Sequence, residues 1–137
     1  MERSPMTATI SDELVSRARG LRDLVRSEAA ESERQRTLTP AIVEQMWSTG
    51  LMTSFNPVEA GGVDPSFVEM IETWLEMAWQ DGSFGWTGLA NLPSSFAAAT
   101  YLPAQGFAEV FTANDNRVTM GVEAIHRFVS ERKGASS

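Results

Sequence analysis

The sequence predicts an all-α protein: an orthogonal domain of about five helices, ending in a short strand-like or irregular C-terminal tail. Three observations support this fold class. Apolar residues recur at helical spacing along most of the chain. Thr39-Pro40 and Asp64-Pro65 each combine a helix-capping residue with a proline, which is tolerated at a first helical position. Only residues 117–121 (RVTMG) have the composition of a strand.

The length and the pattern predict a single domain. A chain of 137 residues is ordinary for one domain with its own core. We expect a flexible N-terminus at residues 1–10, a helical domain at 11–116 and a divergent tail at 117–137.

Composition excludes several kinds of function. The net charge of −7 disfavours a general nucleic-acid binder, which needs clustered basic residues. The absence of cysteine removes disulfides, zinc–thiolate sites and thiol nucleophiles. No apolar run approaches the roughly 20 residues of a membrane span, and the N-terminus has no apolar signal region. We therefore expect a soluble, cytoplasmic protein that binds neither nucleic acid nor membrane.

Two helices are expected in the first part of the chain. Residues 11–33 carry an apolar stripe at helical spacing, and the polar segment 31–37 reads as a helix end and a linker. The second helix begins after the capping residue Thr39, with Pro40 in its first position. Gly50 suits the left-handed position that ends it. Its buried face is predicted to contain Ile42, Val43, Met46 and Trp47.

The stretch GLMTSFNPVEAGG, residues 50–62, is an apolar connection to the next helix. Asn56-Pro57 forbids a helix within it, and Gly61-Gly62 favours a sharp turn. Exposed loops seldom carry so many apolar residues, so we expect a packed loop with four side chains turned inward: Leu51, Met52, Phe55 and Val58.

The third helix is expected to begin at Asp64-Pro65 and to run to about Gln80. Because it is apolar around most of its circumference, it should be central. Its polar side presents Glu69, Glu72 and Glu76, for which a metal site and a solvated face are the alternatives. The solvated face is favoured, since the single histidine, His126, lies in no Glu-x-x-His motif.

Small residues dominate the start of the next helical segment, at positions 82, 83, 85, 88 and 90. They allow the close approach of another helix or of a flat ligand, so tight packing and a pocket wall both remain open. Pro93 predicts a kink or a restart near Asn91. A short helix at 103–112, with an apolar side of Phe107, Val110 and Phe111, and a turn at 113–116 precede the tail.

No catalytic or nucleotide-binding motif stands out. The chain has no Gly-rich phosphate loop and no Ser/His/Asp or Cys/His set. His126 fits a surface or packing role better than a catalytic one. The residues alone therefore indicate an all-α domain with an apolar crevice.

The order of motifs resembles the N-terminal helical domain of the acyl-CoA dehydrogenase and flavin-dependent monooxygenase superfamily. That domain has a helix ending in a small residue, then Gly-Leu, a hydrophobic stretch to a proline, a Gly-Gly turn, a long helix and an Asp-x-Ser segment. The matching residues are Gly50-Leu51, Pro57, Gly61-Gly62 and Asp81-Gly82-Ser83, and Trp86 is more similar to the monooxygenase branch. The resemblance covers about residues 12–120.

The resemblance implies a flavoprotein that uses FAD or FMN. It acts either on CH–CH bonds of acyl-CoA or as a hydroxylase of aromatic or apolar substrates. In this family the flavin lies mainly between a middle β-barrel and a C-terminal four-helix bundle, neither of which this sequence contains. The implied contribution is one wall of the flavin and substrate pocket, built by Phe55, Trp86, Leu89, Asn91 and Phe96. Many relatives place a histidine near the position of Asn91, so no catalytic residue is expected here.

A domain of this kind is expected to be inactive alone. The missing parts would come from a partner chain, and a homo-oligomer is the other expected assembly. The alternative is a non-enzymatic helical interaction module that keeps the fold without the chemistry. A small carrier of apolar ligands is a third interpretation.

Overall fold

The computed structural model describes residues 13–118. Within them the chain forms α-helices and short 3-10 turns and no strand, which confirms the all-α class. The elements are α1 (Glu13–Gly20), α2 (Arg22–Gln35), α3 (Pro40–Ser48), η1 (Val58–Ala60), α4 (Phe67–Gln80), α5 (Gly82–Tyr101), α6 (Ala104–Val110) and η2 (Thr112–Asn114). Arg117 and Val118 are not in a strand. The rest of the expected strand, the tail with His126 and the N-terminus at residues 1–10 lie outside the described residues.

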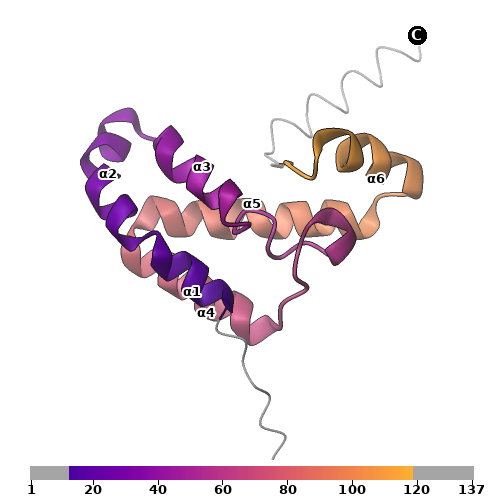
Figure 1. Cartoon of the computed structure of the whole chain (residues 1–137), viewed down its shortest axis with the longest axis horizontal. Helices are drawn as coiled ribbons and strands as arrows, with labels where there is room; N and C mark the ends of the chain where they lie inside the picture. Colours follow the sequence, from indigo (N-terminus) through magenta and orange to yellow (C-terminus); the bar gives the residue numbers. More distant parts are fainter. Residues whose placement is uncertain (1–12, 119–137) are drawn as a thin grey trace, which may run out of the picture.

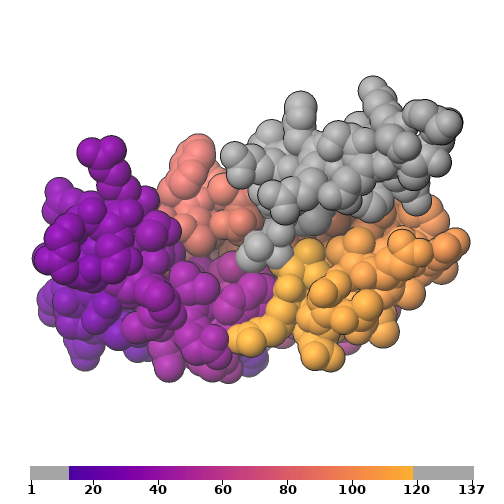
Figure 2. Space-filling model, turned by 90° about the horizontal axis from the view of Figure 1, so that it is seen from above, coloured from indigo at the N-terminus to yellow at the C-terminus, as the bar shows by residue number. Residues whose placement is uncertain are grey.

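The helix α5 forms the long axis of the structure, as Figure 1 shows. It contributes one buried residue to each of three core clusters: Phe84 to the first, Leu92 to the second and Ala99 to the third. The first cluster lies against α2 and α3, and the third lies against α6. The space-filling view accordingly shows α2–α3 and α6 at opposite ends of an elongated body (Figure 2).

The predicted helix over 11–33 is wrong as a single element, because the chain bends at Leu21. Gly20, a poor helix former, ends α1, and the buried Leu21 turns into the first core cluster. The amide of Leu21 donates to the carbonyl of Ala18 at 3.1 Å, a tight turn between the two helices. The chain then continues as α2 to Gln35, where Arg36 adopts the left-handed conformation.

The predicted ends of the second helix are confirmed in α3. The Thr39 hydroxyl accepts the amide of Ile42 at 3.5 Å, and Pro40 is the first helical residue. Gly50 has a φ of 70°, the left-handed conformation in which glycine is least strained. Ile42 and Met46 are fully buried, and Val43 and Trp47 pack partly against the same cluster.

The connection at 50–62 is packed, as predicted, with one exception. Leu51, Met52 and Phe55 are buried. Val58, expected to point inward, is 67% exposed because Ala60, at the other end of the 3-10 turn, faces the third core cluster instead. The Gly-Gly turn is confirmed, with Gly61 at a φ of 79°.

The helix α4 begins two residues later than predicted, with Ser66 as its capping residue in place of Asp64. Asp64 has a φ of 50°, which does not suit a capping residue. Ser66 is extended instead, and its hydroxyl accepts the amide of Glu69 at 3.2 Å. The chain therefore enters the helix from Ser66.

The helix α4 packs between α1 and α5, but it does not bury the apolar circumference that led us to expect a central helix. Its buried residues are mostly polar: Glu69, Thr73, Glu76 and Met77. Large apolar side chains lie on its outer side, with Phe67 70%, Leu75 64% and Trp79 69% exposed. The reason is that α1 packs along the polar side of α4 (Figure 1).

Of the kink or restart predicted near Asn91, the restart does not occur, because α5 is one helix from Gly82 to Tyr101. The Asp81 carboxylate caps it by accepting the amide of Phe84 at 3.0 Å. Pro93 removes only one helical hydrogen bond. The buried Leu92 and Ser95 on either side of it hold the helix against the core.

Candidate functional site

An apolar groove of about 350 Å³ runs between α4 and α5. All of its lining residues are apolar or aromatic: Ile71, Trp74, Leu75, Ala78, Gly82, Gly85, Trp86 and Leu89. None of them titrates, so this groove offers burial and shape and contains no acid, base or nucleophile. Concave apolar sites of this kind are typical binding sites for small molecules.

The floor of the groove depends on close contact between the two helices. A Cβ at Gly85 would lie 2.5 Å from the Ala78 Cα, and one at Gly88 would lie 2.7 Å from the Met77 Cε. For these two glycines the structure therefore confirms tight helix packing. At Gly82 no atom lies within 4 Å of an added Cβ, so the groove is open at that end.

The structure brings two of the five expected wall residues to the groove, Trp86 and Leu89. Phe55 is buried behind it, with its ring 5.3 Å from that of Trp74 in an edge-on arrangement. The Asn91 amide donates to the Thr87 carbonyl of its own helix at 3.1 Å. Phe96 is 41% exposed and lies outside the lining of the groove.

The residues that α4 contributes to the groove were not among the wall residues expected from the sequence. It consists of Ile71, Trp74, Leu75 and Ala78. The available signal was the seven-residue spacing of Ile71 and Ala78, which places both on one helix face opposite the α5 glycines.

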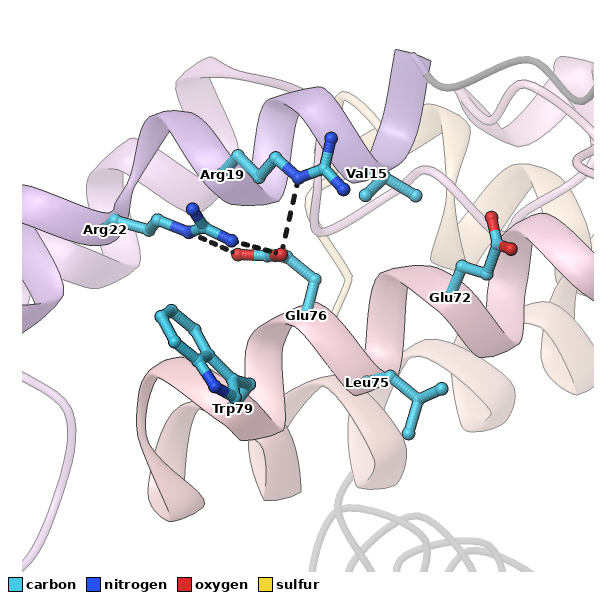
Figure 3. Close-up of a pocket in the computed structure, with 7 residues that line it drawn as sticks. All are labelled: Val15, Arg19, Arg22, Glu72, Leu75, Glu76 and Trp79. Carbon is cyan, nitrogen blue, oxygen red and sulfur yellow. Dashed lines mark hydrogen bonds and ion pairs between the residues drawn. The ribbon is translucent and has the colours of Figure 1, made fainter.

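A second, charged cleft of about 550 Å³ lies between α1 and α4. Figure 3 shows Glu76 at its centre, pointing towards the two arginines on the first helices. Arg22 donates two hydrogen bonds of 2.7 Å to the carboxylate, and Arg19 adds a longer one of 3.4 Å. Gln80 donates a fourth at 2.8 Å, and the Trp79 ring lies 4.8 Å from the Arg22 guanidinium.

This cleft overturns the expected solvated glutamate face. Glu69 is 6% and Glu76 is 8% exposed, whereas Glu72 is partly exposed. The amide of Leu14 donates to Glu69, so both buried carboxylates are used to join α1 and α4. Within residues 13–118 no group of three or more His, Asp or Glu side chains could hold a metal ion.

The Arg22 guanidinium holds the pKa of Glu76 below its usual range, against the opposing effect of burial. A carboxyl group whose pKa is lower in the folded state stabilises the fold above its unfolded pKa. This contribution is lost as the pH falls through the lower, folded pKa.

Replacement of Glu76 by glutamine should therefore make the free energy of unfolding depend less on pH below neutral pH. At neutral pH we expect Glu76→Gln to lower the free energy of unfolding by about 2 kcal/mol, because charge-assisted hydrogen bonds are lost. Below about pH 4 the difference from wild type should shrink. Urea unfolding from pH 7 to pH 3 measures both effects. Glu33→Gln, at an exposed site on α2, is the control, and equal pH profiles for both variants would contradict the assignment.

Comparison with known proteins gives no assignment: the chain matches no family model, no curated protein and no solved structure. Within residues 13–118 no helix is long and apolar enough to cross a membrane. The apolar groove and the charged cleft are therefore the features from which function is argued.

Proposed function

We propose that this chain is the N-terminal helical domain of an acyl-CoA dehydrogenase-like flavoprotein. In this role it forms one wall of the flavin and substrate pocket and is inactive alone. The whole protein would be an oxidoreductase that acts on CH–CH bonds of acyl-CoA or hydroxylates an aromatic or apolar substrate. The observation that carries the proposal is the apolar groove, with Trp86 and Leu89 exposed along it.

The order of elements supports this proposal. The glycine that ends α3, the packed connection, the Gly-Gly turn, α4 and the Asp81 cap of α5 follow one another as the resemblance implies. The helix α5, which begins at the Asp81-Gly82-Ser83 segment of that resemblance and carries Trp86, forms the groove together with α4.

The groove suits the isoalloxazine ring of a flavin, whereas the phosphates of the flavin would be held elsewhere. The Trp86 ring and the glycine-rich end near Gly82 suit the flat face of an isoalloxazine or an acyl chain. No basic side chain lines the groove, so the phosphates of FAD or FMN would bind outside it. The bound flavin would supply the redox chemistry, while this wall would exclude water from the reacting atoms.

The test is to purify the tagged chain from its own cells, in whatever assembly it forms, and to measure released FAD and FMN. We expect near-stoichiometric flavin in the wild-type assembly. Trp86→Ala should reduce the flavin content about tenfold at equal protein, since an aromatic contact of this size contributes more than 1 kcal/mol to binding.

Tyr101→Ala is the matched control, because Tyr101 is 82% exposed at the far end of the same helix. It should retain the flavin content of wild type. An assembly without flavin would contradict the proposal.

The second candidate is a non-enzymatic helical interaction module. The observation that favours it is the outward apolar side of α4, because contiguous exposed apolar surface marks interaction sites. A stable, colourless assembly with another subunit in the same purification would support this candidate over the first.

A further inference from the structure

The outer side of α4 forms an apolar ridge with a cleft on each side. We define the α4 ridge as Val68, Leu75 and Trp79, which are 50%, 64% and 69% exposed. Their spacings of seven and four residues place them on one helix face. Leu75 lines both the charged cleft towards α1 and the apolar groove towards α5, so it lies at the crest between them.

One acidic and one basic side chain, Glu72 and Arg19, lie beside this ridge with hydrogen-bonding groups that are not used within residues 13–118. Glu72 makes no hydrogen bond or ion pair within residues 13–118. Arg19 uses only Nε, in a long bond to Glu76, and its side chain is 54% exposed. Figure 3 shows both residues on the rim of the charged cleft, with Glu72 one turn of α4 before Glu76.

We propose that this face is a dimer interface, in which the α4 ridges of two copies of the chain pack antiparallel about a two-fold axis near Leu75. A two-fold axis requires a patch that is complementary to itself. Glu72 precedes Leu75 along α4, whereas Arg19 contacts α4 after Leu75, at Glu76. In an antiparallel pair the α1 side of one copy lies against the α1 side of the other, and the two α4 helices run in opposite directions. Glu72 of each copy therefore faces Arg19 of the other.

The size of the face suits a weak, reversible dimer. With Phe67, the ridge and its charged rim offer on the order of 600 Å² per copy, the lower end of specific interfaces. Helices pack by inserting the ridge of one into the groove of the other. Side chains of the two α4 ridges would interdigitate in this way on either side of the two-fold axis. We expect a dissociation constant in the micromolar range.

This inference does not depend on the proposed flavin role, which rests on Trp86 and Leu89 of α5. The test is sedimentation velocity of the full chain across the micromolar range. Wild type should shift from one to two chains per particle as concentration rises. Leu75→Glu should raise the dissociation constant roughly 100-fold, because a charge would replace the central apolar contact.

Val58→Glu is the matched control, since Val58 is equally exposed but lies in the connection at 50–62. Circular dichroism should show the same helix content in both variants. Glu72→Arg should weaken the dimer about tenfold by facing Arg19, whereas Glu33→Arg, with the same change in net charge, should not.

Cross-linking tests the position of the two-fold axis, because the chain has no native cysteine. Leu75→Cys should form a disulfide-linked dimer on mild oxidation, and Tyr101→Cys should remain monomeric under the same conditions. A wild type that stays monomeric throughout would overturn the proposal. Equal cross-linking through Tyr101, or unchanged dimerisation of Leu75→Glu, would also overturn it.

Discussion

Replacement of Phe84 by alanine should lower the free energy of unfolding by about 4 kcal/mol. Phe84 is fully buried where α5 meets the first core cluster, among residues of α2, α3 and α4. Truncation removes its apolar contacts and leaves a cavity that three helices would have to move to fill. Since a domain has only about 5–15 kcal/mol of stability, a clear loss of thermal stability should follow. Urea unfolding followed by circular dichroism measures this change.

The control is the aromatic residue two positions further on. Trp86 is 69% exposed, so Trp86→Ala should change the free energy of unfolding by no more than about 0.5 kcal/mol. Similar losses in the two variants would contradict the assignment of Phe84 to the buried side of α5 and of Trp86 to its exposed side.

Replacement of Gly62 by alanine should destabilise the fold by about 3 kcal/mol or more. The new Cβ would overlap the carbonyl oxygen of Asn56 and would lie 2.8 Å from the Asn56 Cα. These atoms belong to the backbone, so no side-chain rotation relieves the overlap. The connection would have to move, and with it the buried Phe55.

Gly20→Ala is the matched control for this change. Nothing lies within 4 Å of a Cβ at Gly20. Alanine also has a higher helix propensity than glycine at this last residue of α1. We expect a gain of about 0.5 kcal/mol, measured by the same urea unfolding. A Gly62→Ala protein as stable as wild type would mean that the close approach to Asn56 is not required for the fold.

Boundaries set by local chemistry could be predicted from the sequence. Thr39, Pro40 and Gly50 act within one helical turn of α3, so their neighbours in the chain determine what they do. The packed connection was also predictable, because its apolar residues leave few other arrangements. Val58 was the exception, since only the direction of the 3-10 turn decides that Ala60 faces inward.

The inner side of α4 could not be predicted. Helical periodicity separates an apolar face from a polar face, and the usual rule then places the apolar face inside. Here Glu76 is buried because Arg22 and Arg19, 54 and 57 residues earlier, supply its hydrogen bonds. Such distant pairing leaves no local pattern in the sequence.

The candidate site was predictable only where it depends on residues that are close in the sequence. The small residues of α5 indicated a close approach, and Trp86 and Leu89 lie on the groove. Phe55 belongs to the core because the connection folds it behind Trp74. Which α4 residues complete the groove depends on the rotation of that helix about its axis, which α1 determines.

The outward side of α4 and the exposed side of α5 also give the protein an optical signal of its own. Two of its four tryptophans, Trp79 and Trp86, are 69% exposed, whereas Trp47 and Trp74 pack against the core. Any molecule that covers either surface removes water from an indole ring and shifts its fluorescence to shorter wavelength. Trp79→Phe and Trp86→Phe would then report separately which of the two surfaces is occupied, without an added label.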